Sequence, residues 1–313
     1  MLGKTAAGLY WMFRYLERSE NTARMLDAGF RIALTRSTAA EDEWVSVLAS
    51  AGSHNSYIEQ YDQIDAPSVI NFLLREKNNP SSVMSMVETA RNNARLVRTA
   101  LTREVWEATN ECWMTMKDLL AHPIHEKELP AVLRSIRQQS ALVRGALHGT
   151  MLRNDSYDFA RIGTFLERAD NTARILDVKY YVLLPSAQHV GTSIDNVQWE
   201  TILLSVSGRS AYHWLYEGET NPVSIANFLI LDRQMPRSFA FCFTKLAETL
   251  GYLGEDYNIE HPCQLKAEAM LKNLKQKTIN DIIDQGLHEF IQDFISENQK
   301  IASMIEEDFR FYG

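Results

Sequence analysis

The segment Leu16–Asp27 reads LERSENTARMLD, and the segment Leu166–Asp177 reads LERADNTARILD. Nine of the twelve positions are identical, whereas composition alone would give about one match. Similarity between two segments at a fixed shift is typical of an internal repeat. We therefore predict two homologous halves, residues 1–149 and 150–313, which together form one compact unit.

Further blocks recur in the same order in both halves. A Trp and a Tyr keep the same mutual spacing, and an Asn-Phe-Leu triplet is followed at the same distance by Pro. The matched residues are Trp44, Tyr57, residues 71–73 and Pro80 in the first half, and Trp199, Tyr212, residues 227–229 and Pro236 in the second. The repeat therefore extends well beyond the twelve-residue block.

The composition predicts a helical protein. The 313 residues are 45% hydrophobic and 23% charged, and they include only 14 Gly and 8 Pro. Such low Gly and Pro usage argues against a β-sandwich, a barrel or a disordered chain. We predict an all-α fold, a duplicated antiparallel helical bundle with two pseudo-equivalent halves.

Apolar periodicity and the positions of Pro and Gly predict where the helices lie. One long helix opens each half, over residues 6–35 and 157–184. The remaining helices are predicted near 41–61, 67–77, 81–101, 103–120 and 127–152 in the first half, and near 196–217, 222–232, 237–250, 262–275 and 277–311 in the second, after a loop at 185–195. Because of the repeat, we expect the two opening helices to pack against each other at the centre.

Several classes of protein are disfavoured by the sequence. The apolar runs are too short to span a bilayer, and residues 1–12 lack the pattern of a secretory signal, so we expect a cytoplasmic protein without a membrane partner. The net charge is −8, with 17 basic and 17 acidic residues in 1–150 against 15 and 23 in the rest. No basic face is evident, so we expect no nucleic-acid partner. The three cysteines, Cys112, Cys242 and Cys263, form no C-x-x-C pair.

Polar side chains form a stripe on each opening helix, beside its apolar stripe. The stripe residues are Glu17, Glu20, Asn21, Arg24 and Asp27 in the first half, and Glu167, Asp170, Asn171, Arg174 and Asp177 in the second. Three interpretations are open: a solvated face with exposed ion pairs, a buried structural network, or a functional site. Exposed pairs contribute little to stability and can be exchanged freely, so the identity of the two blocks favours the other two interpretations.

A second basic set occurs in the first half only. Glu88, Arg91, Arg95 and Arg98 are spaced so that they share one helical face. Arginines without an obvious partner suit a carboxylate or phosphate ligand. Pairing with the helix that carries Glu17 and Glu20 is at least as good an explanation, and we expect Arg91 and Arg95 to lie near those carboxylates.

The sequence predicts neither a metal site nor a cofactor. No Glu-x-x-His motif occurs, although helical di-metal sites are built from such motifs. His122 and His125 lie on either side of Pro123, away from a regular helix. Walker A, G-x-G-x-x-G and G-x-S-x-G motifs are also absent from the sequence.

The motifs taken together resemble the bacterial alpha-E family, helical domains of obscure function. The resemblance covers essentially the whole chain and is carried by residues 11–27 (WMFRYLERSENTARMLD), 88–98 (ETARNNARLVR), 103–110 (REVWEATN) and 148–177, with Tyr157 where the family often has Trp. It implies association with circularly permuted ATP-grasp ligases and transglutaminase-like proteins, and hence with ATP-dependent amide-bond formation on a peptide or small metabolite.

Three hypotheses for the function follow. The chain is an accessory or substrate-binding subunit of an ATP-grasp-type amide ligase, a stand-alone enzyme of amide-bond formation or transfer, or a non-catalytic structural protein. An enzyme would need a Glu general base with a raised pKa, yet neighbouring arginines lower it. The candidate catalytic residues are Glu17, Glu20, Glu167 and Asp170, and the candidate ligands of a peptide or amino acid are Asn21, Arg24, Arg91, Arg95, Asn171 and Arg174.

Overall fold

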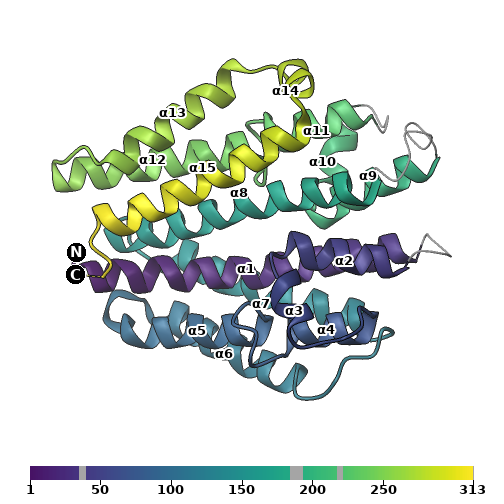
Figure 1. Ribbon diagram of the computed structural model, residues 1–313. Coiled ribbons are helices and arrows are strands. Elements are labelled where there is room, and N and C mark those ends of the chain that lie inside the picture. Colours follow the sequence, from purple (N-terminus) through teal and green to yellow (C-terminus); the bar gives the residue numbers. More distant parts are fainter. Residues whose placement is uncertain (35–39, 184–192, 217–220, 313) are drawn as a thin grey trace.

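The computed structural model describes residues 1–34, 40–183, 193–216 and 221–312, and in these ranges it contains fifteen α-helices and no strand (Figure 1). The predicted all-α class is confirmed. The helices of the first half are α1 (Gly3–Ala33), α2 (Ala40–Ser50), α3 (His54–Ile58), α4 (Ala66–Leu74), α5 (Val83–Leu96), α6 (Arg103–Leu119) and α7 (Leu129–Thr150). Those of the second half are α8 (Asp155–Leu183), α9 (Ser193–Ser205), α10 (Arg209–Leu215), α11 (Pro222–Ile230), α12 (Phe239–Tyr257), α13 (Pro262–Gln276), α14 (Ile279–Gln285) and α15 (Leu287–Asp308).

The two long helices α1 and α8 pack side by side at the centre (Figure 1). The two helices run in the same direction. Tyr10 contacts Gly163 and Arg14, one turn later on α1, bonds to Glu167, one turn later on α8. A Cβ atom at Gly163 would lie only 2.4 Å from the carbonyl oxygen of Tyr10, so Gly is what allows this close approach. The central pair is thus parallel, where the sequence led us to expect an antiparallel bundle.

The helices that flank the central pair run the opposite way. On α7, Arg137 pairs with Asp27 and Arg144 with Glu17, so α7 is antiparallel to α1. On α15, His288 contacts Asp177 and Asn298 donates to the carbonyl of Leu166, so α15 is antiparallel to α8. The expected antiparallel arrangement therefore holds for these neighbours.

Each half has its own hydrophobic core, and the central helices contribute to both. In Figure 1 the helices α4, α5 and α6 of the first half lie below α1, and α12, α13 and α15 of the second half lie above α8. Leu9 and Tyr10 of α1 belong to the core of the second half, whereas Met12 and Phe13 belong to that of the first. In addition, α2 packs on α8 and α9 packs on α1, so each half reaches across to the other.

Three predicted helices are interrupted. The predicted helix 41–61 is divided into α2 and α3 around Gly52, the helix 196–217 into α9 and α10 around Ser207, and the helix 277–311 into α14 and α15 at Gly286. The φ angles at these residues are +65°, +56° and +102°, which no α-helix accommodates. Most of the predicted loop 185–195 falls outside the described residues.

An aromatic trio repeats in the two halves. Tyr57 stacks on Tyr61 with ring centroids 4.8 Å apart, and Tyr212 stacks on Tyr216 at the same 4.8 Å. Phe72 and Phe228 meet these pairs edge-on. The amides of Asn71 and Asn227 donate to the hydroxyls of Tyr61 and Tyr216 at 3.2 and 3.1 Å. The blocks matched in sequence are therefore also matched in geometry.

No helix in the described ranges combines the length and the apolar content that crossing a membrane requires.

Candidate functional site

A reciprocal pair of salt bridges joins α1 to α8. Arg168 donates to Glu17 from Nε (3.0 Å) and Nη2 (3.1 Å), and Arg18 donates to Glu167 from Nη2 (2.8 Å) and from Nε. Each Glu-Arg dipeptide therefore binds the other one. The two carboxylates are almost completely buried, with 1% and 3% of their surface exposed.

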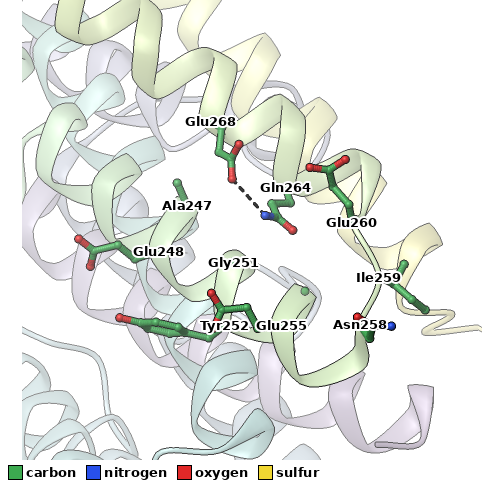
Figure 2. A pocket seen from close by; sticks show the side chains of 11 residues that line it. Ala247, Glu248, Gly251, Tyr252, Glu255, Asn258, Ile259, Glu260, Gln264 and Glu268 are labelled. Carbon is green, nitrogen blue, oxygen red and sulfur yellow. Dashed lines mark hydrogen bonds between the residues drawn. The ribbon is translucent and has the colours of Figure 1, made fainter.

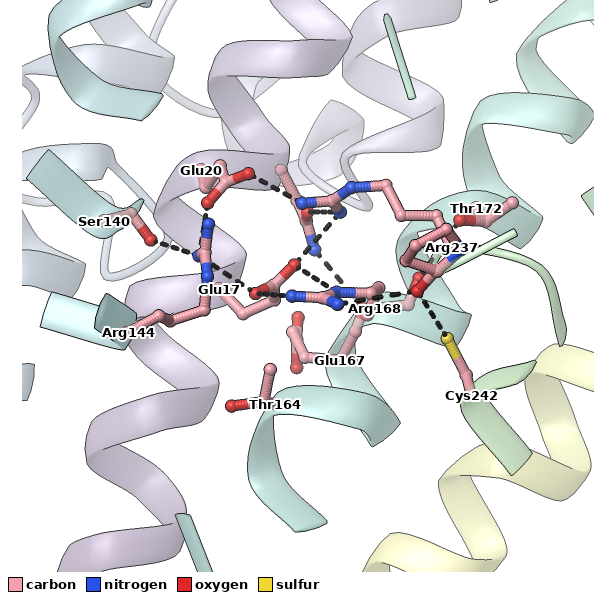
Figure 3. Close-up of polar contacts among 12 residues, drawn as sticks. Glu17, Glu20, Ser140, Arg144, Thr164, Glu167, Arg168, Thr172, Arg237 and Cys242 are labelled. Carbon is pink, nitrogen blue, oxygen red and sulfur yellow. Dashed lines mark hydrogen bonds and ion pairs between the residues drawn. The ribbon is translucent and has the colours of Figure 1, made fainter. Parts of the chain in front are cut away.

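Around Glu17 lies what we call the first cluster, Glu17 and Glu20 with Arg24, Arg144, Arg168 and Arg237. Figure 3 shows the two carboxylates with Arg144, Arg168 and Arg237. Arg237 bridges the carboxylates, 3.0 Å from Glu17 and 2.6 Å from Glu20, and it also donates to Oδ1 of Asn21 at 3.3 Å. Arg144 donates to both carboxylates from the opposite side. Burial and repulsion by Arg24 lower the pKa of Arg237 to about 9, so this guanidinium stays charged at neutral pH.

The second cluster consists of Glu167 and Asp170 with Arg14, Arg18 and Arg174. Arg14 donates to Glu167 at 3.0 Å, alongside Arg18, and Arg174 donates to Asp170 at 2.6 Å. Arg174 also reaches the carbonyl of Ser50 at 3.3 Å, just as Arg24 reaches the carbonyl of Ser205 at 2.7 Å. The two clusters thus connect each long helix to the end of a helix in the other half.

The buried carboxyl groups are held in the ionised form. Burial by itself raises their pKa values, but the neighbouring guanidinium charges outweigh it. The pKa of Glu20 falls to about 2, mainly through Arg237, and that of Glu167 falls to about 2 through Arg18 and Arg14. Arg168, Arg237 and Arg144 hold the pKa of Glu17 well below its ordinary value. A general base that works near neutral pH needs a higher pKa, so these three residues are poorly suited to proton abstraction.

A cavity of about 280 Å³ lies next to the second cluster, and we call it the Asn171 cavity. Its lining combines the polar stripe of α8 with residues of α1 and of the segments around α2, α4 and α5. The lining residues are Arg18, Asn21, Thr22, Met25, Ala51, Gly52, Ser53, Leu73, Ser81, Glu167, Asp170, Asn171, Arg174 and Gln299. Asn171 is only 3% exposed, yet neither its Oδ1 nor its Nδ2 has a hydrogen-bond partner among the residues that the structure describes. A buried amide without partners costs free energy, which a bound ligand would recover.

The α5 arginines do not join the first cluster. Arg91 donates to Oδ1 of Asn110 at 2.7 Å and lies 4.2 Å from the ring centroid of Trp113. Arg95 is exposed. No hydrogen bond or ion pair among the described residues connects either arginine to Glu17 or Glu20, so the expected clustering of Arg91 and Arg95 with these carboxylates is not observed.

The remaining stripe residues have other partners. Asp27 pairs with Arg31 and Arg137, and Asp177 contacts His288 and Gln292. Asn21 donates to the carbonyl of Glu167 at 3.3 Å. The stripe is therefore buried and bonded almost everywhere except at Asn171.

Sequence reasoning missed the arginines that complete the clusters. Arg18 and Arg168 stand in the repeated block directly after the glutamates, and their recurrence was a usable signal. Arg237 follows Pro236 in another matched block, but the corresponding residue of the first half is Ser81, so this arginine does not recur. Nothing in the local sequence around Arg144 or Arg14 points to a buried carboxylate in the other half or on the neighbouring helix.

Another cavity lies between α12 and α13, with a volume of about 630 Å³ (Figure 2). Four exposed glutamates line it, Glu248, Glu255, Glu260 and Glu268, and Gln264 donates to Glu268 at 3.1 Å. It is an open acidic groove on the surface, without a buried charged residue. Among the described residues, no three His, Cys, Asp or Glu side chains are grouped as a metal site would require.

Comparison with known proteins identifies relatives without an assigned activity. A family model named Alpha-E, described as a predicted alpha-helical domain with a conserved ER motif, matches residues 1–309. Uncharacterized proteins of Mycobacterium bovis and Mycobacterium tuberculosis are 24% identical over 265 residues, which is 79% of this chain and 29% of each relative. The chain therefore spans less than a third of the length of these relatives. No solved structure matches the chain.

Proposed function

The chain belongs to the Alpha-E family of helical domains, and on that premise we propose that it is a substrate-binding or accessory subunit of an ATP-grasp-type amide ligase. The substrate would be a peptide or an amino acid. The ligase would supply ATP binding and acyl activation, for which this chain has no sequence motif.

The unpaired amide of Asn171 is the single observation that carries the proposal. A side-chain amide offers one acceptor and two donors, which is the complement of a peptide group. Glu167, Asp170, Arg18 and Arg174 line the same cavity and offer both signs of charge to an amino or carboxylate group. A small zwitterionic or peptidic ligand fits that mixture better than an anion or a cofactor of one sign.

Independent catalysis by this chain is the weaker alternative. The lowered pKa values of Glu17, Glu20 and Glu167 leave these carboxylates too weakly basic to deprotonate an amine near neutral pH. Their oxygens are also occupied by guanidinium groups, so a substrate would have to displace buried ion pairs. We assign the first cluster a structural role, in which it fixes α1 against α8.

The proposed partners are a circularly permuted ATP-grasp ligase and a transglutaminase-like protein, as the family resemblance implies. The relatives support a helical unit that works together with other protein segments, because the region they share with this chain covers only 29% of their length. The setting in which such partners act would be cytoplasmic.

We also infer that the two halves arose by duplication, with the boundary near residues 149 and 150. The nine identities in twelve positions support this inference, as do the reciprocal bridges of Glu17 with Arg168 and of Glu167 with Arg18. A self-complementary face of an ancestral dimer would leave this kind of reciprocal contact.

Reconstitution with a ligase tests the proposal. The chain is mixed with the circularly permuted ATP-grasp ligase of the same genome, and amide formation from amino acids and peptides is measured with ATP. We expect product formation to increase when the chain is present, and to fall back with Asn171→Leu but not with Asn92→Leu, an exposed control on α5.

Equal rates and products with and without the chain, together with no co-elution at low salt, would contradict the accessory role. Product formed by the chain alone from an activated acyl donor would instead favour the stand-alone enzyme. The transglutaminase-like protein is tested in the same way, as a second candidate for co-elution.

A further inference from the structure

The two clusters offer the same polar groups at matching positions. Glu17, Glu20 and Asn21 on α1 correspond to Glu167, Asp170 and Asn171 on α8, because the repeated blocks align without a gap. In the first half, the guanidinium of Arg237 contacts all three members, Glu17, Glu20 and Asn21. Two carboxylates and an amide in this arrangement therefore bind a guanidinium group.

The residue that corresponds to Arg237 in the first half is Ser81. Each of the two residues follows a proline and precedes the serine that caps the next helix. Ser82 caps α5 by accepting from the backbone N–H of Ser85, and Ser238 caps α12 by accepting from that of Phe241. Ser81 lines the Asn171 cavity. The short serine side chain therefore stands at the edge of the cavity where an arginine would enter it.

The second cluster consequently has one guanidinium fewer than the first. Four arginines surround Glu17 and Glu20, whereas three surround Glu167 and Asp170 among the described residues. Arg174 binds Asp170 through Oδ2, and no described hydrogen bond reaches the other oxygen. The amide of Asn171 also lacks the partner that Asn21 finds in Arg237.

We propose that the Asn171 cavity binds a guanidinium group supplied by a ligand, either the side chain of an arginyl peptide or a free guanidino compound. The planar cation takes the place that Arg237 occupies at the first cluster, with the second oxygen of Asp170 and the Oδ1 of Asn171 as its acceptors. This inference rests on the proposed function, in that it takes the cavity to be the substrate site, and it specifies the chemical class of the substrate.

The acceptors favour a guanidinium over an ammonium group. A guanidinium presents five N–H donors in a rigid plane, which lets it bridge two carboxylates and an amide as Arg237 does, whereas an ammonium is a compact point charge. The cavity volume of about 280 Å³ leaves room for part of the attached chain as well. Arg18 and Arg174 line the same cavity and would donate hydrogen bonds to the carboxylate of free arginine or of a C-terminal arginine.

Titration calorimetry on the 313-residue chain tests the inference with three probes: L-arginine, methylguanidinium and L-citrulline. Citrulline is the matched control, because its ureido group has nearly the shape of a guanidinium but no charge. We expect arginine to bind at least about ten-fold more tightly than citrulline, since charge-assisted hydrogen bonds are the stronger ones. Methylguanidinium should bind weakly and compete with arginine.

Variants of the protein locate the site. Ser81→Arg should fill the cavity with the protein's own guanidinium, abolish arginine binding and raise Tm. Ser56→Arg adds the same charge at an exposed position outside the cavity, and it should leave binding and Tm unchanged. Asn171→Leu should weaken arginine binding by about ten-fold or more without adding a charge.

The outcomes separate this inference from the proposed function. Equal affinity for arginine and citrulline, or arginine binding that survives Ser81→Arg, would overturn the guanidinium assignment. A peptide without arginine could bind to the unsubstituted protein but not to Ser81→Arg. In that case the cavity remains a substrate site and only the ligand class is wrong. Absence of binding by all probes and peptides at millimolar concentration would overturn both.

Discussion

At the scale of single residues, the buried carboxylates are stable only because several guanidinium groups surround each one. A carboxylate that leaves water loses several kcal/mol of hydration, and one ion pair rarely restores it. Glu17 is contacted by Arg144, Arg168 and Arg237 from α7, α8 and the segment before α12. Its charge therefore holds together elements that are far apart in the sequence.

Substitution of Glu17 should therefore lower stability strongly. In Glu17→Gln the three arginines lose half of their shared counter-charge and stay buried, and we expect the free energy of unfolding to fall by about 3 kcal/mol. Urea denaturation followed by circular dichroism measures the change. Glu107→Gln is the control, because the side chains of Glu107 and Arg103 are 57% and 83% exposed, and its effect should stay within about 0.5 kcal/mol.

A double variant distinguishes a lost bridge from a general defect. Glu17→Leu combined with Arg168→Leu should be less destabilising than the sum of the two single changes, since neither partner is left as an uncompensated buried charge. Strict additivity of the two effects would show that the bridge contributes no coupling energy.

The same ion pairs predict how stability depends on pH. The pKa values of Glu20 and Glu167 are lowered from 4.5 to about 2 by folding, so the folded state binds fewer protons in this range than the unfolded state. The contribution of these groups is complete above the unfolded pKa and disappears as the pH falls through the folded pKa. We expect a loss of roughly 3 kcal/mol per group between about pH 5 and pH 2.

Denaturation midpoints measured at a series of pH values check this expectation. The slope between pH 5 and pH 2 should be smaller in Glu20→Gln than in the unsubstituted chain, because one of the titrating groups is gone. A stability that is independent of pH in this window would contradict the assignment of Glu20 and Glu167 as buried, ionised carboxylates.

The repeat made half of each cluster visible from the sequence, and the other half needed the fold. Glu17, Glu20 and their counterparts were recognisable because an exchangeable surface pair has no reason to recur unchanged. Arg144 and Arg237 were not, because nothing in their local sequence indicates which carboxylate they meet more than a hundred residues away. Arg91 was expected to lie near Glu17 and Glu20, but it contacts Asn110 and Trp113 on the adjacent helix α6 instead.

At the scale of elements, apolar periodicity located the helices but not the breaks within them. A single left-handed residue ends a helix without disturbing the apolar pattern on either side, as at Gly52 and Gly286, with φ angles of +65° and +102°. Ser207 does the same with φ +56°, although it is not glycine, so composition gives no warning there. The α12 helix continues to Tyr257, beyond the predicted residue 250, and ends at Asn258 in the left-handed conformation.

The close contact of α1 with α8 yields a prediction about glycine. Gly163→Ala places a Cβ 2.4 Å from the backbone oxygen of Tyr10, so the helices must separate along the seam that contains the salt bridges. We expect a loss of about 2 kcal/mol or more in the free energy of unfolding, as for other overpacked sites. Thermal unfolding followed by circular dichroism measures it.

Gly145→Ala is the matched control on α7. Apart from its own stretch of helix, no described atom lies within 4 Å of a Cβ built at Gly145, so the substitution should stabilise the helix by about 0.5–1 kcal/mol through the higher helix propensity of alanine. Equal effects of the two substitutions would show that the approach of α1 to α8 is looser than the geometry implies.

At the scale of the whole molecule, the two halves depend on each other's polar groups. The carboxylate of Glu17 is neutralised by Arg168 and Arg237 of the second half, and that of Glu167 by Arg14 and Arg18 of the first. Separated halves would each expose buried, uncompensated charges and part of an apolar core. We therefore expect that the proposed boundary near residues 149 and 150 does not separate two units that fold independently.

This dependence predicts a single cooperative transition. Calorimetric unfolding of the full chain should give one peak whose calorimetric and van't Hoff enthalpies agree, although many chains of more than 150 residues unfold in several steps. Residues 1–150 and residues 151–313, produced separately, should be largely unfolded by circular dichroism and should regain helicity when mixed. Arg168→Leu on the second fragment should prevent that recovery, because Glu17 of the first would then be buried without its reciprocal partner. Two resolved peaks in the full chain, or a fragment that folds alone with a sharp transition, would contradict this prediction. Each half would then fold independently, and the salt bridges would only orient the two halves relative to each other.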